Sequence, residues 1–491
     1  MLNIPEVKLG IIAVSRSCFP KPLSERRRSA IVKSFGENMY ECPITVETEM
    51  DAKKAVEDIR ENGVNALVMF LGNFGPETPE TMVVEWFDGP IMYLAAAEGD
   101  GDLYDGRGDA YCGMLNCSYN LGLRGKPAYI PEYPIGTAEE LAEKIREFIP
   151  ISRAMIGMKN LKIITFGPRP DDFLACNAPI KPLYDLGVAV EENSELDLLA
   201  AYNKHKNDPR IAEKMAEMKA ELGANNQFEN ALPRLAQYEL TLLDWVEEHK
   251  GTREYVAIAG KCWPAFQTEF GFVPCYVNSR LTGMGIPVSC EVDIYGALSE
   301  YIGACVSGMP VTLLDINNTV PQSIYDKAIA GKYEVRIAET FMGFHCGNTY
   351  AELLKNPHLS YQVIMKRALE PDLPEPNITC GTMEGDIKAG KVTFFRLQSA
   401  ADTRLLAYIA EGESLDVPTE SFGSIGVFAI PEMERFYRHV LIQKRFPHHG
   451  AVAFGHFGKA IFEVFKYLGI ADISYNQPKS LPYPSENPFG R

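Results

Sequence analysis

The chain has 491 residues and a formal net charge of −17; 46% of its residues are hydrophobic and 23% are charged. This length exceeds what a single hydrophobic core supports, so we expect roughly two to four domains of ordinary globular composition. The excess of negative charge excludes a general nucleic-acid binder or a binder of anionic membranes, because both need a basic face.

No apolar run is long enough to span a bilayer, and the first residues lack the basic and apolar segments of a secretory signal. The eleven cysteines include no C-x-x-C pair, and several lie within strand-like or helix-like runs. We interpret these cysteines as small buried side chains. A protein of the reducing cytoplasm is therefore expected, with neither a membrane nor a nucleic acid as its partner.

Residues 1–160 alternate apolar strand-like runs with helical patterns. Strands are predicted over 8–14 and 66–71, and a helix over 24–39 with Ser24 as its N-cap. Alternation of this kind implies a parallel sheet that is covered by helices on both faces. We therefore predict an N-terminal α/β domain of the Rossmann-like type.

A second α/β domain is predicted over 161–325. It opens with a strand over 161–166, but no G-x-G-x-x-G motif follows, which argues against a classical dinucleotide site. Two later apolar runs, 287–290 and 311–314, flank a helical pattern. They are predicted to form a βαβ unit, which would bring the ends of both strands to one edge of the same sheet.

Residues 326–491 have a different pattern, in which short strands alternate with turns. This pattern predicts a β-rich C-terminal domain with an antiparallel, barrel-like sheet. The predicted strands lie over 336–340, 391–397, 404–410 and 424–430.

Two carboxylates and one imidazole occupy positions suited to chemistry. Glu291 and Asp315 each follow a strand of the predicted βαβ unit, and His449 lies in a C-terminal stretch that holds three of the eight histidines. Strand ends are where open α/β proteins place their active sites. We therefore expect the three side chains to bind one divalent cation.

A donor set of this kind suits Mn²⁺, with Mg²⁺ or Co²⁺ as alternatives, and the lack of a suitably spaced thiolate disfavours Zn²⁺. Sugar oxygens would complete the coordination, and the cation would polarise the carbonyl group at C1. Glu291 and Asp315 would then move protons between C1 and C2 of the sugar. The sequence thus predicts a metal-dependent aldose–ketose isomerase that acts through an enediol.

Each of these three residues also has a structural interpretation. Asp315 is suited to cap a loop, Glu291 to pair with a basic residue, and His449 to stabilise the turn after Pro447. His456 is an alternative ligand, because it also follows a predicted strand.

Four further residues are candidates for contacts with the substrate. Trp263 offers a stacking face and Gln267 a partner for a hydroxyl group, although core packing also explains the tryptophan. His345 is either a hydrogen-bond partner of the substrate or a buried structural histidine. Arg445 suits an acidic group on the substrate if it points inward, and is otherwise a surface arginine.

At these residues the sequence resembles the L-fucose isomerase/L-arabinose isomerase superfamily, and more closely its fucose isomerase branch. The stretch from Glu291, which reads Glu-Val-Asp-Ile-Tyr-Gly-Ala-Leu, resembles the branch's first metal ligand, and Asp315 follows at a matching separation. His449-Gly450 and Gly455-His456-Phe457-Gly458 resemble the C-terminal motif that carries the third ligand.

The resemblance implies a three-domain subunit and a homo-oligomer, either a hexamer or a trimer. It implies that Glu291 and Asp315 are both ligands and the acid/base pair, and that His449 is the third ligand. It also implies that Arg16 and the Asn73-Phe74 loop reach the sugar from the N-terminal domain of a neighbouring subunit.

The chain departs from the fucose isomerase branch in features that bear on the substrate. It is about a hundred residues shorter than is typical, its Asn73 loop lacks a tryptophan, and Arg445 replaces an uncharged amide. A deoxy sugar and an acidic or sulfonated sugar are both candidate substrates. The alternative functions are a non-catalytic sugar-binding or regulatory protein, or another metal-dependent sugar enzyme such as an epimerase or a lyase.

Overall fold

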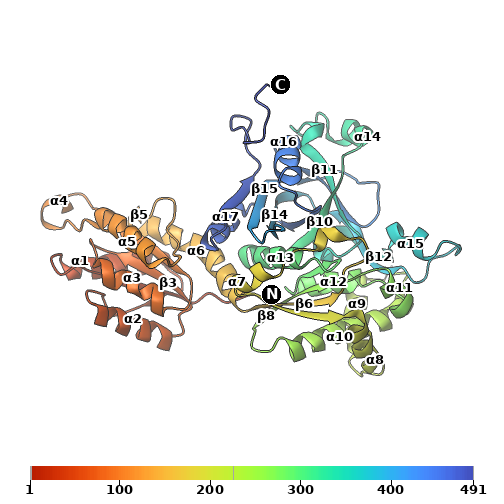
Figure 1. The fold of residues 1–491 in the computed structure, drawn as a ribbon, viewed down its shortest axis with the longest axis horizontal. Helices are drawn as coiled ribbons and strands as arrows, with labels where there is room; N and C mark the ends of the chain where they lie inside the picture. The colour runs from red at the N-terminus through yellow and green to blue at the C-terminus, as the bar shows by residue number, and fades with distance from the viewer. Residues whose placement is uncertain (1–2, 225, 490–491) are drawn as a thin grey trace. The chain divides into compact units, whose positions relative to one another are not determined.

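A computed structural model describes residues 3–224 and 226–489 of the chain (Figure 1). The described residues form two compact units. The N-terminal unit comprises residues 5–156 and 463–469, and the larger unit comprises the rest. None of the helices in the described ranges is both long enough and apolar enough to cross a membrane.

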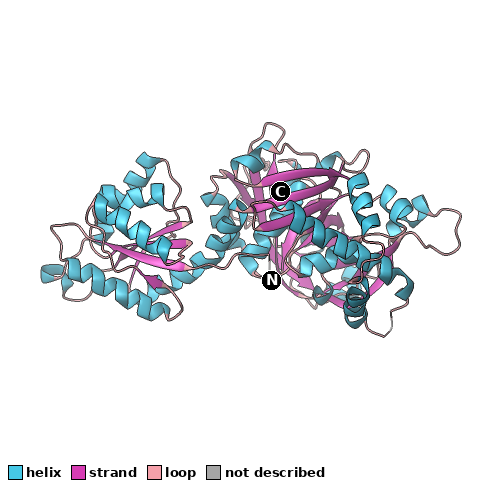
Figure 2. Cartoon of the chain, turned by 90° about the horizontal axis from the view of Figure 1, so that it is seen from below, coloured by secondary structure: helices cyan, strands magenta, loops and turns pink. Residues whose placement is uncertain are grey.

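The N-terminal unit is built on a parallel sheet with the strand order β2-β1-β3-β4-β5, and helices cover both faces of this sheet (Figure 2). Its three long strands are apolar and buried throughout, as expected for strands covered on both sides. The strands are β1 (Leu9–Val14), β2 (Tyr40–Glu41), β3 (Ala66–Leu71), β4 (Ile91–Ala96) and β5 (Ile135–Gly136). The helices are α1 (Lys21–Phe35), α2 (Glu49–Glu61), α3 (Glu77–Trp86), α4 (Asp102–Asp105), α5 (Ala110–Arg124) and α6 (Ala138–Lys159).

The predicted N-cap of the first helix is wrong. Helix α1 begins at Lys21 because Pro22 fits the first turn, where its missing N–H group has no helical acceptor to bond. Ser24 lies inside the helix, is buried, and donates a hydrogen bond to the Val14 carbonyl at 2.6 Å. It therefore joins α1 to the end of β1.

A buried carboxyl group in α3 makes the N-terminal unit sensitive to pH. Burial raises the pKa of Glu80 to about 8, and the Cys117 thiol offsets only part of that rise. Because the unfolded chain ionises near 4.5, the folded unit holds one extra proton between about pH 4.5 and about pH 8. Its stability therefore falls as the pH rises through this window.

Glu80→Gln is expected to remove this pH dependence, since glutamine does not ionise. Relative to the wild type, the variant should gain up to about 1.4 kcal/mol for each pH unit between pH 5 and pH 8. Thermal unfolding of both proteins at the two pH values measures the gain. Burial also raises the pKa of Glu300 to about 8, but this group is present in both proteins and cancels in the comparison. A difference in melting temperature that stays constant with pH would contradict the assignment.

The larger unit contains a parallel sheet with the strand order β7-β6-β8-β9. Its strands are β6 (Leu161–Gly167), β7 (Ala189–Ser194), β8 (Tyr255–Gly260) and β9 (Val288–Cys290). The helices in this part of the chain are α7 (Lys181–Asp185), α8 (Glu195–Lys204), α9 (Ile211–Leu222), α10 (Leu232–His249), α11 (Ala265–Phe270), α12 (Cys275–Gly283) and α13 (Ile294–Ser307). Helix α13 is buried along nearly its whole length, because strands of both sheets of the larger unit pack against it.

The second sheet of the larger unit has nine strands, in the order β12-β13-β16-β11-β10-β17-β14-β15-β18. Strand β15 also pairs with β16, so the six strands from β16 to β15 form a closed ring. The strands are β10 (Thr312–Asn318), β11 (Thr340–His345), β12 (Leu354–Tyr361), β13 (Cys380–Ile387), β14 (Gly390–Ser399), β15 (Leu405–Leu415), β16 (Ser424–Ala429), β17 (His449–Ala453) and β18 (Asp472–Tyr475). The helices in this part of the chain are α14 (Gln322–Ile324), α15 (Val363–Leu369), α16 (Met433–Phe436) and α17 (Gly458–Tyr467), and residues 463–467 of α17 belong to the N-terminal unit. The strand predicted over 336–340 starts only at Thr340.

The predicted fold class is confirmed, because two parallel sheets with helices precede a large β-rich sheet. The predicted βαβ unit is wrong. Strand β9 belongs to the parallel sheet, whereas β10 lies in the closed ring and pairs antiparallel with β11 and β17. Glu291 and Asp315 therefore come from different sheets, and a shared sheet edge is not what brings them together.

Candidate active site

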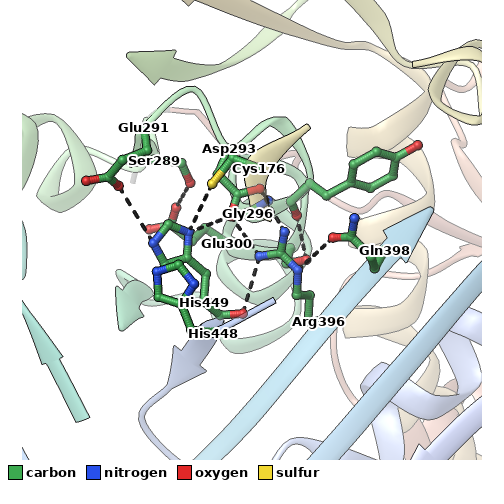
Figure 3. A network of polar contacts seen from close by, with 12 residues as sticks. Cys176, Ser289, Glu291, Asp293, Gly296, Glu300, Arg396, Gln398, His448 and His449 are labelled. Carbon is green, nitrogen blue, oxygen red and sulfur yellow. Dashed lines mark hydrogen bonds and ion pairs between the residues drawn. The ribbon is translucent and has the colours of Figure 1, made fainter. Parts of the chain in front are cut away.

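Glu291, Asp315 and His449 meet at one buried place in the larger unit. Figure 3 shows two of these residues, Glu291 and His449, with their side chains turned toward each other. The Nε2 atom of His449 lies 3.3 Å from Asp315 Oδ1 and 3.6 Å from Glu291 Oε2. Asp315 and His449 are direct partners across the antiparallel pair of β10 and β17. The backbone ladder therefore sets the spacing of these two side chains.

Glu291 reaches the same place from a tight turn after β9. Its backbone is left-handed, with φ of 55°, and so is that of Val292, with φ of 58°. This conformation is strained for a β-branched residue, and strain of this kind gathers at functional sites. Hydrogen bonds from Val292 N to Gly260 O and from Asp293 N to Cys290 O hold the turn.

Asp293, two residues after Glu291, holds the other side of the His449 ring. Its Oδ2 atom lies 2.8 Å from His449 Nδ1, and both side chains are 1% exposed. This contact makes Nδ1 the protonated nitrogen and turns the Nε2 lone pair toward Glu291 and Asp315. Sequence reasoning missed Asp293, although an aspartate directly before a helix is a recognisable N-cap signal.

The ionisation of the site is set by ion pairs that outweigh burial. Burial favours the neutral carboxyl group, yet His345 and His449 hold the pKa of Glu291 below its usual value. For Asp315, burial again favours the neutral form, but the nearby histidines, chiefly His449, lower its pKa to about 2. Burial disfavours a charged imidazole, but the hydrogen bond to Asp293 and the nearby Asp315 carboxylate raise the pKa of His449 well above its usual value. A cation that binds at Nε2 therefore displaces a proton from this ring.

The site fits a divalent cation. Glu291 Oε2 and Asp315 Oδ1 are buried oxygen atoms without a hydrogen-bond partner among the described residues. Buried carboxylate oxygens normally have partners, so two orphaned oxygens facing one imidazole nitrogen require an explanation. Oxygen and imidazole donors of this kind suit Mn²⁺ or Mg²⁺. The metal itself stays a prediction.

Two more imidazoles flank the three donors. His345, at the end of β11, is buried, and its Nε2 lies 3.7 Å from Glu291 Oε2. Its Nδ1 accepts a hydrogen bond from Cys346 N, so Nε2 carries the proton and points it toward Glu291. His448 is half-exposed, with Nε2 3.7 Å from Asp315 Oδ1. The alternative ligand His456 instead contacts Gly412 O at 3.1 Å.

Trp263 and Gln267 are each linked to the three donors through one intervening residue. The Trp263 ring packs edge-on against Phe173, whose own ring contacts both His448 and His449, so these aromatic rings form a wall next to the site. Gln267 is fully buried, and its Nε2 donates to the carbonyl of Cys262. The Cys262 thiol in turn lies 3.5 Å from Glu291 Oε1. Substrate contacts by Trp263 and Gln267 stay predictions.

Of the three other predicted contacts, Arg445 belongs to the larger unit, whereas Arg16 and Asn73 belong to the N-terminal unit. Arg445 is exposed, has φ of 62°, and lines a depression of about 820 Å³ together with Lys444 and Arg404. In the N-terminal unit, the Arg16 guanidinium stacks 4.8 Å above the Phe74 ring.

Asn73 shapes the loop that follows β3. It is buried, accepts hydrogen bonds from Arg16 N and Gly75 N, and donates one to Ser15 Oγ. The amide of Asn73 is thus occupied within its own unit. Roles for Asn73, Arg16 and Arg445 in substrate binding stay predictions.

The sequence is similar to two protein-family models and to several curated proteins. The chain matches the N-terminal domain of fucose/sulfoquinovose isomerases over residues 10–159 and the C-terminal domain of L-fucose isomerase over residues 343–475. It is 25% identical over 343 residues to a sulfoquinovose isomerase of Alkalicoccus urumqiensis, covering 68% of this chain and 70% of that protein. It is 28% identical over 298 residues to a sulfoquinovose isomerase of Clostridium sp. (strain MSTE9), covering 60% of each chain.

Proposed function

Because the chain belongs to the fucose isomerase family and is an aldose–ketose isomerase, we propose that it binds a divalent cation, with Mn²⁺ as the first choice, through Glu291, Asp315 and His449. The observation that carries the proposal is the pair of buried oxygens, Glu291 Oε2 and Asp315 Oδ1, that face His449 Nε2 and accept no hydrogen bond from residues 3–224 and 226–489. When bound, the cation polarises the sugar oxygens at C1 and C2, which makes the C2 proton more acidic.

Glu291 and Asp315 move the protons in the proposed reaction. Both are ionised at neutral pH, because each pKa lies below its usual value, so each is able to accept a proton. One carboxylate removes the proton from C2, and the resulting enediol is reprotonated at C1, while the hydroxyl proton passes from O2 to O1. The aromatic rings of Phe173 and Trp263 line one side of the site and offer an apolar face to the sugar.

Removal of the cation is the direct test. Dialysis against a chelator is expected to lower the isomerase rate by about two to three orders of magnitude, because polarisation by a cation contributes several kcal/mol. Added Mn²⁺ should restore the rate. Product analysis by NMR in D₂O should show a ketose with deuterium at C1, whereas an epimerase would return only aldoses. A chelated enzyme that keeps its full rate would contradict the cation.

We further propose that the substrate is a sulfonated hexose, with an uncharged deoxy sugar as the alternative. The support is the name of the curated relatives, which are sulfoquinovose isomerases, and the exposed Arg445 guanidinium. A strong acid such as a sulfonate is recognised best by an arginine, whose charge is permanent.

Arg445→Ala is expected to raise KM for a sulfonated hexose by roughly 10- to 100-fold, because a charge-assisted hydrogen bond contributes about 1.5–3 kcal/mol. KM for the matched neutral sugar should stay the same. Steady-state kinetics with both sugars measure this change in preference. Arg438→Ala, at another exposed arginine of the same segment, is the control. If both variants keep the wild-type preference, Arg445 does not select the substrate.

We also propose that the protein acts in the cytoplasm as a homo-oligomer. All eleven cysteines are free thiols, which fits a reducing compartment. Helix α5 exposes a stripe of large apolar side chains at intervals of four residues, which is typical of a surface that another chain covers. The stripe consists of Tyr111, Leu115, Tyr119 and Leu123. Light scattering of the purified protein measures the mass of the assembly.

A further inference from the structure

The Asp293 carboxylate accepts four hydrogen bonds in a place closed to solvent (Figure 3). Arg396, from β14, binds it through two nitrogen atoms, each at 2.8 Å from one carboxylate oxygen. Gly296 N donates to Oδ1 at 2.9 Å, and His449 Nδ1 lies 2.8 Å from Oδ2. Both carboxylate oxygens are therefore fully used, and the carboxylate has one fixed orientation.

Arg396 holds His449 at a second point. One of the two nitrogens that bind Asp293 also lies 3.3 Å from the backbone carbonyl of His449. The Nε atom of Arg396 donates to Gln398 Oε1 at 2.8 Å, which fixes the plane of the guanidinium. The ring of His449 is thus held through Asp293 and its backbone directly through Arg396.

Stability alone does not account for the buried ion pair between Arg396 and Asp293. Arg396 and Asp293 are each about 1% exposed, and a hydrophobic pair of similar size is often as stable as a buried ion pair. A helix N-cap needs only the bond to Gly296, which a serine or threonine would provide. Neither the stability of the ion pair nor the need for a helix N-cap explains why Asp293 also bonds His449 Nδ1.

We propose that Asp293 and Arg396 are positioning residues, which orient His449 so that its Nε2 lone pair meets the cation held by Glu291 and Asp315. This inference rests on the proposed function, because it requires that a cation binds at these three groups. A carboxylate that accepts the second ring N–H of a ligand histidine fixes its tautomer and raises its basicity. Arg396 in turn fixes the carboxylate.

The affinity for Mn²⁺ tests this assignment with a readout that does not depend on turnover. The full-length protein is stripped of metal and titrated with MnCl₂, and free Mn²⁺ is followed by electron paramagnetic resonance. Asp293→Asn is expected to weaken Mn²⁺ binding by about 10- to 100-fold. Arg396→Lys keeps the charge but loses the two-point geometry, and should weaken binding by a smaller factor. If D293N does not fold, R396K decides the question.

Glu239→Gln is the matched control. Glu239 is also fully buried in the larger unit and pairs with a buried arginine, since Arg280 Nε lies 2.6 Å from it. E239Q therefore breaks a comparable ion pair far from His449 in sequence and outside its contacts, and should keep the wild-type affinity for Mn²⁺.

Four outcomes separate the possibilities. Weaker binding by D293N and R396K, with unchanged binding by E239Q, supports the positioning role. Wild-type affinity in D293N and R396K overturns that role and leaves the proposed cation intact. Equal weakening in all three variants also overturns it, because the pair would then matter only for folding. A wild-type protein that binds no Mn²⁺ refutes the cation proposal and this inference together.

Discussion

Replacing Glu291 with glutamine is expected to lower kcat by about 10²- to 10⁴-fold, the range that a positioned acid or base contributes to proton transfer. Glutamine fills the same space in the buried turn, but it removes both the proton acceptor and the charge that faces His449 Nε2. Asp315→Asn should cause a loss of similar size. The double variant should be hardly slower than either single one, because the two carboxylates act as a unit. The fall in kcat of each variant is measured by the rate of ketose formation and by the rate of deuterium exchange at C2 of the sugar.

The matched control for this experiment is Glu384→Gln, which makes the same chemical change at another buried glutamate of the larger unit, on β13. Circular dichroism and the melting temperature establish that both variants are folded. We expect E384Q to keep its rate. An E291Q protein that turns over sugar as fast as E384Q would remove Glu291 from the acid/base pair.

Replacing Arg396 with methionine should have the largest effect on stability. The substitution keeps the apolar length of the side chain but leaves the Asp293 carboxylate buried without its counter-ion. Removing one partner of a buried ion pair costs about 3–5 kcal/mol. For a unit of this size, that loss lowers the melting temperature by roughly 5–10 °C. Calorimetry of the wild type and the variant measures the shift.

A double variant shows whether the lost stability belongs to the pair. Arg396→Met combined with Asp293→Asn should recover part of the loss, because no charge is then left buried alone. The control is Arg404→Met, which removes an exposed arginine paired with Asp402 and should cost less than about 1 kcal/mol. Strictly additive effects in the double variant would mean that Arg396 and Asp293 do not stabilise each other.

The convergence of Glu291, Asp315 and His449 was predictable from the sequence because each adjoins an apolar run that forms a strand, while their binding of a cation stays a prediction. Glu291 follows β9, while Asp315 and His449 lie in β10 and β17. The parallel sheets were also predictable, since strands covered on both faces are almost continuously apolar. The C-terminal strands showed the shorter spacing of an antiparallel sheet.

The pairing of β10 was not predictable from its own residues. The run 311–314 is equally apolar whether its neighbours are parallel or antiparallel, so local sequence does not distinguish the two sheets. The role of Asp293 was hidden for a similar reason, because its partners Arg396 and His449 lie 103 and 156 residues further along the chain. Contacts over such distances depend on the assembled fold.

Asp315 and His449 lie opposite each other on neighbouring strands of a closed ring, so the main-chain hydrogen bonds between the strands fix the distance between the two residues. Inserting or deleting one residue within either strand would turn one of the two side chains to the opposite face. Loops between the strands tolerate changes in length far better. Relatives that act on different substrates are therefore expected to differ in the lengths of their loops, while the lengths of these two strands stay constant.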